Sequence, residues 1–143
     1  MKDTIEPSAK AIWEAVSYSV TEKGETNTEP TTDADWAALR NKAAALLKVA
    51  GTVTLPALKI AHDGEDKTPA YQYSAAEIEQ LRKQNIDLWR ENAQHMQTTT
   101  QRLIDDIEKH DLDAYLEDGV LLNQACEACH AEFWYRPQRR GMQ

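Results

Sequence analysis

Apolar residues recur at intervals of three and four through the second half of the chain, and this spacing constrains the fold more than any other feature. One stripe runs from Ile86 to Ile107, and a second runs from Leu112 to Phe133. Because residues three and four apart share one face of a helix, each stripe predicts a long helix with a buried face. The members are Ile86, Trp89, Ala93, Met96, Thr100, Leu103 and Ile107 in the first stripe, and Leu112, Tyr115, Gly119, Leu122, Cys126, Cys129 and Phe133 in the second.

The first half of the chain predicts another helix from about Glu6 to Val20. Pro7 suits the first helical position, because its missing N–H needs no partner there. Ile12, Val16 and Val20 then repeat every fourth residue, which indicates one apolar face. After Val20 the pattern stops.

Capping and turn residues set the other boundaries. The polar run 21–31 predicts a solvated connection, and no segment predicts a strand. Thr32 or Asp33 caps a second helix that Gly51 ends, and Ser74, with a glutamate three residues on, forms a capping box that opens the helix of the first long stripe. The second helix has an apolar face of Trp36, Leu39, Ala43, Leu46 and Ala50. A break near 110–111 separates the last two helices, and the final one ends before Pro137.

Four amphipathic segments joined by alternating long and short connections predict an all-α fold, an antiparallel four-helix bundle. The 143 residues suit a single domain, 1–143. The net charge of −8 disfavours nucleic acid and anionic membranes as partners. No apolar run approaches the roughly 20 residues that span a bilayer, so we expect no membrane insertion.

The only two cysteines fall in the motif Cys126-Glu127-Ala128-Cys129-His130. Two thiols one helical turn apart, followed by an imidazole, are the groups that bond both vinyl groups of a haem and ligate its iron. The alternatives are a disulfide, a zinc half-site and a thioredoxin-like pair. Zinc needs a further ligand, and none of the other histidines, at positions 62, 95 and 110, has a paired ligand spacing. A thioredoxin-like pair needs a preceding strand, which this sequence does not predict.

A CxxCH motif on the final helix of an all-helical chain resembles the class II cytochromes c, of which the cytochromes c′ are the best-known members. Class I cytochromes c carry the motif near the N-terminus instead. The resemblance extends over essentially the whole chain, including 7–13 and 35–40. It implies that Cys126 and Cys129 attach one haem c and that His130 is the proximal iron ligand. Many cytochromes c′ have Arg or Lys four residues after this histidine, where this chain has Trp134, with Arg136 beyond it.

Aromatic and aliphatic side chains are expected on the two faces of the haem. Trp13, Trp36, Trp89 and Phe133 are placed for this packing, although a tryptophan on an apolar stripe is more often core. Low-spin members of the class have a methionine ligand on the first helix, whereas residues 7–20 contain neither Met nor His. We therefore expect an open or apolar distal side, lined by some of Trp13, Val16 and Ser17.

Two functions follow from this resemblance: electron transfer between redox partner proteins, or binding of small diatomic gases such as nitric oxide or carbon monoxide. We do not expect an enzyme, because the two glutamates that flank the motif, Glu127 and Glu132, are expected to be solvated. Covalent haem attachment outside the cytoplasm predicts a periplasmic protein, present here as a mature chain without its export signal. The resemblance also implies a homodimer through the first two helices, with aromatic surface from Trp13, Tyr18 and Trp36.

Overall fold

The computed structural model describes residues 5–60 and 68–137, and within these ranges the chain forms five helices and two strands. The helices are α1 (Ile5–Glu14), α2 (Asp33–Thr52), α3 (Ala75–Gln84), α4 (Ile86–Lys109) and α5 (Leu112–Phe133), and the strands are β1 (Ser17–Thr21) and β2 (Gly24–Thr28). The fold is mostly helical, as predicted. The expectation of an entirely helical chain is wrong, because the two strands form a small antiparallel sheet.

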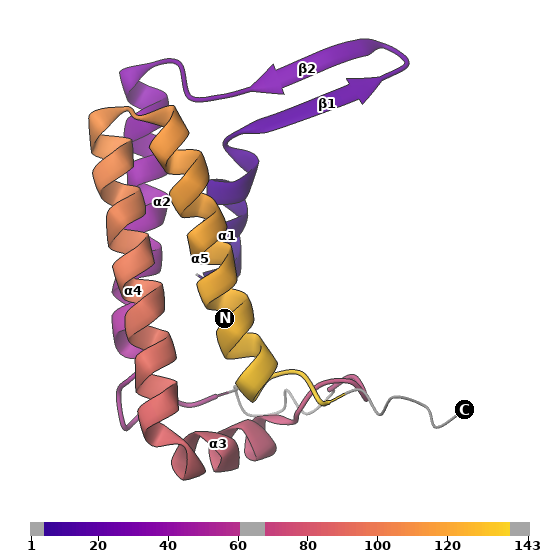
Figure 1. Ribbon diagram of the computed structural model, residues 1–143, viewed down its shortest axis with the longest axis vertical. Helices are drawn as coiled ribbons and strands as arrows, with labels where there is room; N and C mark the ends of the chain where they lie inside the picture. The colour runs from indigo at the N-terminus through magenta and orange to yellow at the C-terminus, as the bar shows by residue number, and fades with distance from the viewer. Residues whose placement is uncertain (1–4, 61–67, 138–143) are drawn as a thin grey trace.

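The long helices α2, α4 and α5 lie side by side, with α1 packed on α2, and the short α3 crosses one end (Figure 1). The core lies between these helices and is made of Ile12, Trp36, Leu39, Ala43, Leu46, Leu103, Ile104, Ile107, Tyr115 and Leu122. All five residues that the spacing assigned to the buried face of α2 are buried. Within the described ranges, no helix is both long and apolar enough to span a bilayer.

The N-terminus of α2 lies where the sequence predicts it. The Thr32 hydroxyl accepts a hydrogen bond from the Asp35 amide at 3.2 Å, and the Asp35 carboxylate accepts one from the Thr32 amide at 2.9 Å. This reciprocal pair satisfies two N–H groups that a helix start leaves without partners. The helix ends at Thr52, one residue beyond the predicted Gly51.

The first helix is shorter than predicted, because it ends at Glu14 and the chain turns into a β-hairpin. Ser17 pairs with Thr28 and Thr21 with Gly24, and the hairpin projects away from the helices with every strand residue exposed (Figure 1). Gly24 has φ +124, a conformation that side-chain-bearing residues rarely adopt. Residues 17–20 alternate Ser with Tyr or Val, which suits a strand, although Val20 also fits the four-residue repeat of a helix. The turn at Gly24 favours the hairpin.

The helix that begins at Ser74 is interrupted, which corrects the prediction of one long helix. Its capping box is present, with the Ser74 hydroxyl accepting from the Glu77 amide. At Asn85 the backbone leaves the helical region, and its side-chain amide donates to the Leu81 carbonyl at 3.0 Å. Asparagine competes in this way for helix backbone groups, so α3 ends and α4 begins in a new direction.

The break between the last two helices is confirmed. His110 adopts a left-handed conformation (φ 53), and the Asp111 carboxylate accepts from the Ala114 amide at the start of α5. The His110 ring stacks on Trp36 with 5.0 Å between ring centroids. At its other end α5 stops at Phe133, before Pro137 as predicted.

Candidate functional site

The CxxCH residues occupy the last two turns of α5, at the end of the molecule that α3 crosses (Figure 1). Cys126 and Cys129 are half-buried and are free thiols. Burial raises the pKa of each thiol to about 11, and the charge of Glu127 adds to the shift for Cys126. Both thiols are therefore protonated at neutral pH. A redox-active dithiol has the opposite property, a thiol pKa lowered toward neutral pH.

His130 is partly open to solvent, with 26% of its side chain exposed. Its Nδ1 lies 3.3 Å from a carboxylate oxygen of Glu127, one turn earlier on α5. When Nδ1 carries the proton, it donates to this carboxylate and leaves the lone pair on Nε2. A carboxylate in this position orients a ligating histidine and makes it more basic. Glu127 is exposed, as expected from the sequence, but its contact with His130 was not predicted. The spacing of three residues between them could have indicated this contact.

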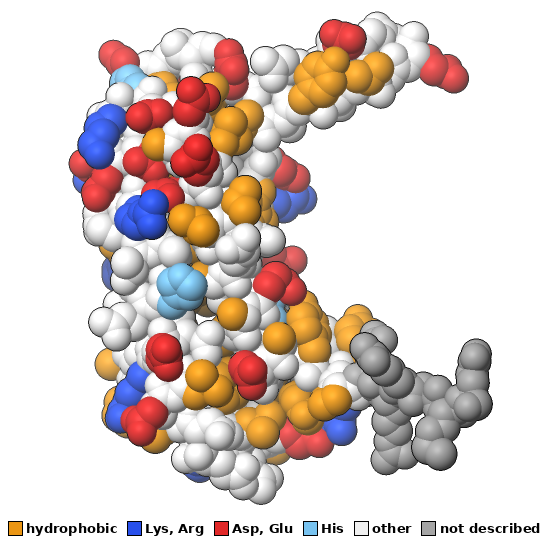
Figure 2. Space-filling view, viewed as in Figure 1, with side chains coloured by type: hydrophobic (Ala, Val, Ile, Leu, Met, Phe, Trp, Pro, Cys, Tyr) orange, Lys and Arg blue, Asp and Glu red, His pale blue; other side chains and the backbone are white. Residues whose placement is uncertain are grey.

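A groove of about 360 Å³ lies between α1 and α5. Its walls are mostly apolar, and it is lined by Ile12, Trp13, Val16, Tyr115, Leu116, Gly119, Val120 and Asn123. Gly119 contributes no side chain to the groove, and nothing lies within 4 Å of where a Cβ would be. The Tyr115 hydroxyl joins the two walls by donating to the Ile12 carbonyl at 2.5 Å. Figure 2 shows hydrophobic side chains along this part of α5, whereas charged ones crowd the α4–α5 turn.

The groove and the histidine share one face of α5. Leu116, Val120, Asn123, Glu127 and His130 follow one another at intervals of four, three, four and three, which places them in one row along the helix. The first three line the groove, and the last two are the carboxylate and imidazole pair. A flat ligand bonded to the neighbouring cysteines can therefore reach from the imidazole toward the groove. This second row was not predicted, because the prediction for α5 rested on its apolar stripe alone.

The residues expected on the distal side have different environments. Trp13, 44% exposed, and Val16, half-buried, both line the groove. Ser17 does not line it, because it is the first residue of β1 and lies exposed opposite Thr28. Phe133 is buried outside the groove.

The other aromatic residues considered are mostly core. The Phe133 ring meets Trp89 edge-on at 4.9 Å, and the Trp89 indole N–H donates to the Val53 carbonyl. Trp36 is buried against Tyr115 at the far end of the core. Trp36 is therefore inaccessible to a second subunit, while Trp13 and Tyr18 remain exposed.

The remaining histidines that the structure describes lie on elements other than α5. His95 is exposed on α4, and His110 stacks on Trp36 at the α4–α5 turn. His62 lies outside the described residues. Met96 is half-buried and packs against the core. In residues 5–60 and 68–137, no three His, Cys, Asp or Glu side chains gather in a way that could hold a metal ion.

Comparison with known protein families, characterised proteins and solved structures finds no match for this chain. The site is therefore judged on its own chemistry. Two free thiols one turn apart, an imidazole whose Nδ1 lies beside a carboxylate and a nearby apolar groove are features that a covalently attached haem would use.

Proposed function

We propose that this chain is a c-type monohaem protein, similar to the cytochromes c′, that carries electrons between redox partner proteins. Cys126 and Cys129 bond the two vinyl groups of one haem, and His130 ligates its iron through Nε2. Bound in this way, haem iron supplies one-electron redox chemistry. Helices α1, α2, α4 and α5 then act as an antiparallel four-helix bundle in which α5 carries the cofactor, and the protein works in the periplasm, where c-type haem is attached.

The observation that carries the proposal is the row on α5 that joins the apolar groove to His130. A haem needs apolar surface on both faces and one nitrogen ligand at the iron. The groove supplies apolar walls from α1, the turn after it and α5, and its lining on α5 ends at Asn123, one turn before Cys126. Glu127 holds the imidazole by one nitrogen so that the other is available. Burial keeps the thiols protonated, which protects them from oxidation until they are used.

The test of this proposal is covalent attachment. When the chain is expressed with a c-type maturation system, it should gain the mass of one haem that survives extraction with acidic acetone. Cys126→Ala or Cys129→Ala should each remove one thioether bond, and His130→Ala should change the optical spectrum in both oxidation states. Val20→Ala is the control, because Val20 is exposed on the hairpin and does not line the groove, and its spectrum should match the parent. A colourless or fully extractable product would refute the proposal.

Binding of small diatomic gases is the second function that the site supports. The observation that favours it is the composition of the groove: the wall opposite α5 is made of Ile12 and Trp13 of α1 and Val16 just beyond it, none of which can ligate iron. An apolar distal side excludes charged ligands and admits small neutral ones such as carbon monoxide or nitric oxide. In this proposal the ferrous iron has His130 as its only protein ligand.

Carbon monoxide uptake by the ferrous holoprotein tests the gas-binding function, and electron transfer is compatible with such uptake. Trp13→Ala should widen the groove and raise the association rate by about tenfold, if packing limits entry. Tyr18→Ala removes an aromatic side chain from the exposed hairpin and should leave the rate unchanged. A low-spin ferrous spectrum that changes only on mutation of Met96 or a histidine outside the motif would exclude the gas-binding function and leave electron transfer.

The homodimer remains a prediction. Trp13 and Tyr18 are the exposed aromatic residues that could enter such an interface. Sedimentation should show a dimer that Trp13→Glu dissociates. A monomer at high concentration, with no change in the variant, would contradict it.

A further inference from the structure

The chain that follows His130 folds back and is tied to the segment before α3. The Tyr73 amide donates to the Trp134 carbonyl at 2.8 Å, and the Arg136 amide donates to the Tyr71 carbonyl at 2.9 Å. Gln72 and Tyr135 form an isolated antiparallel bridge between the same two segments. Residues far apart in sequence thus make a short backbone ladder beside the end of α5.

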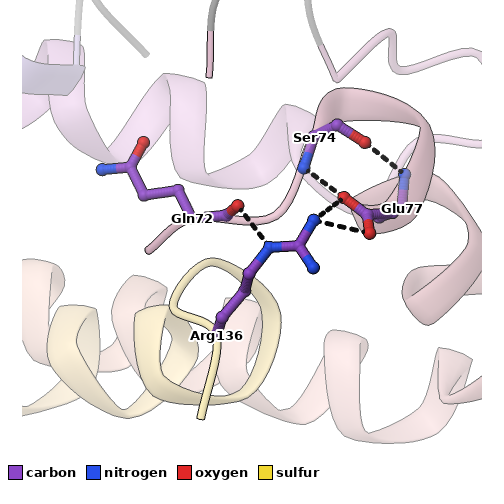
Figure 3. A network of polar contacts seen from close by, with 4 residues as sticks. All are labelled: Gln72, Ser74, Glu77 and Arg136. Carbon is purple, nitrogen blue, oxygen red and sulfur yellow. Dashed lines mark hydrogen bonds and ion pairs between the residues drawn. The ribbon is translucent and has the colours of Figure 1, made fainter. Parts of the chain in front are cut away.

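Arg136 adds side-chain contacts to this ladder (Figure 3). Its Nε donates to the Gln72 carbonyl at 2.8 Å, and its Nη2 donates to the Glu77 carboxylate at 2.6 and 2.7 Å. The guanidinium also lies over the Tyr73 ring, 5.2 Å from its centroid. Glu77 is held in turn by the Ser74 amide, in the capping box of α3. Arg136 therefore connects the end of α5 to the fixed start of another helix.

The two residues inside this ladder face the histidine. The Trp134 and Tyr135 rings meet the His130 ring nearly edge-on, at 4.9 and 5.9 Å between centroids. The amides of both residues donate to the His130 carbonyl at 2.9 Å. His130 lies in the last turn of α5, where carbonyl groups lack helical partners and helices fray most readily. Among the described residues, only the Arg136 side chain and the backbone ladder bond residues 134–136 to the segment before α3.

We propose that Arg136 and Glu77 form a clamp that positions His130. By holding residues 134–136 on the start of α3, the clamp keeps the two aromatic rings against one side of the imidazole, while Glu127 holds its Nδ1. The orientation of Nε2 toward an iron is then set by the tertiary structure and does not depend on the last turn of α5 alone. This inference rests on the proposed function, because it concerns His130 as an iron ligand.

The contacts of the clamp are tested first by amide hydrogen exchange. In Arg136→Ala the amides of Tyr73, Trp134 and Tyr135 should exchange about three- to tenfold faster, as expected when one or two hydrogen bonds are lost. Arg136→Lys keeps the charge but loses the two-pronged geometry, so it should show a smaller increase. Arg90→Ala is the matched control: it removes the same charge from an exposed pair with Asp87 on α4 and should leave these amides unchanged.

The positioning role is tested by the iron–histidine stretching band of the ferrous holoprotein in a resonance Raman spectrum. In Arg136→Ala this band should shift or broaden, and in Arg136→Lys it should change less. Ser74→Ala weakens the cap of α3 but retains Glu77 as the partner of Arg136, so its band should keep the parent position. This control separates positioning from general loosening of α3.

The outcomes separate the two proposals. If the parent protein binds haem covalently and exchange accelerates in Arg136→Ala while the Raman band does not move, the clamp is only structural and this inference is wrong. If the parent protein binds no haem, the proposed function fails first, and the inference fails with it. A band that moves equally in Ser74→Ala and Arg136→Ala would also contradict a specific role for Arg136.

Discussion

The two halves of α5 use their side chains in opposite ways. In the first half Tyr115 and Leu122 are buried in the core, and the nearly buried Asp118 pairs with Arg102 of α4 at 2.6 Å. In the second half Ala125 and Phe133 are buried, but the two cysteines and His130 are only half-buried. A partly exposed ion pair beyond the helix end adds a further tie to the rest of the molecule. The second half thus keeps its thiols and imidazole partly accessible and adds polar contacts at its edge to the burial that also holds the first half.

A buried acidic group on α4 faces the first half of α5. Asp106 on α4 is 8% exposed, and its Oδ2 is buried with no hydrogen-bond partner among the described residues. Burial raises the pKa of Asp106, and the neighbouring Asp118 raises it further, while Lys109 opposes the shift. The two acids face each other from α4 and α5 in a polar pocket with Arg102. A proton shared between them would link the helices.

The largest expected effect compares the two halves directly. Leu122→Ala should lower the free energy of unfolding by about 2–5 kcal/mol, because Leu122 is fully buried and its loss leaves a cavity. Cys129→Ala in the haem-free protein should cost less than about 1 kcal/mol, because a small half-buried side chain is removed. Urea unfolding of both variants measures the difference. Equal losses of unfolding free energy in the two variants would show that the two positions contribute equally to stability.

The second effect is pH-dependent. Because the pKa of Asp106 is raised in the folded protein, its carboxyl keeps a proton at pH values where the unfolded chain has released it. The free energy of unfolding therefore falls as the pH rises from the ordinary pKa of an aspartate to the raised pKa. Asp106→Asn should remove this loss and raise the free energy of unfolding at pH 7 by about 1 kcal/mol. Below the ordinary aspartate pKa the advantage should disappear.

A neighbouring acid provides the control for that variant. Asp105 lies one residue earlier on α4 but is exposed, and Asp105→Asn removes the same charge. Its effect should stay within about 0.5 kcal/mol at both pH values. A stabilisation of the same size in both variants would show that net charge, and not the buried acid pair, is responsible.

A smaller effect concerns the joint between α1 and α5. Tyr115→Phe removes the hydroxyl that donates to the Ile12 carbonyl, one of the last carbonyls of α1, which lack partners within the helix. The expected loss is about 0.5–1.5 kcal/mol in urea unfolding. Tyr18→Phe removes a hydroxyl from the exposed hairpin and serves as the control. If the two variants behave alike, the hydroxyl of Tyr115 does not stabilise the groove.

The smallest effect is expected in the hairpin. Val20→Thr keeps a β-branched side chain at a fully exposed strand position and should change the free energy of unfolding by less than about 0.5 kcal/mol. Thermal unfolding of this variant beside Leu122→Ala compares an exposed position with a fully buried one. A large loss would mean that the hairpin contacts another surface in solution.

The sequence by itself determined the helices whose patterns extend over many turns. The buried face of α2 and the capping boxes at Thr32 and Ser74 depend on residues within one or two turns, so local spacing predicts them. The CxxCH motif is equally local, and its position on the last helix follows from the same stripe. The length of α1 and the continuity of the third helix were predicted wrongly, because Ser17–Thr21 and Asn85 suit more than one conformation.

Only the tertiary structure decided what surrounds the motif. The groove requires α1 and α5 to lie together, and Ser17 leaves it because the chain turns into β1. The clamp joins Arg136 to Glu77, 59 residues apart in sequence, and the acid pair joins Asp106 of α4 to Asp118 of α5. Such contacts depend on how the helices pack, and side-chain spacing along one helix contains no information about which residues a neighbouring helix will present. The reactive groups are therefore visible in the sequence, while their positions relative to one another are a property of the fold.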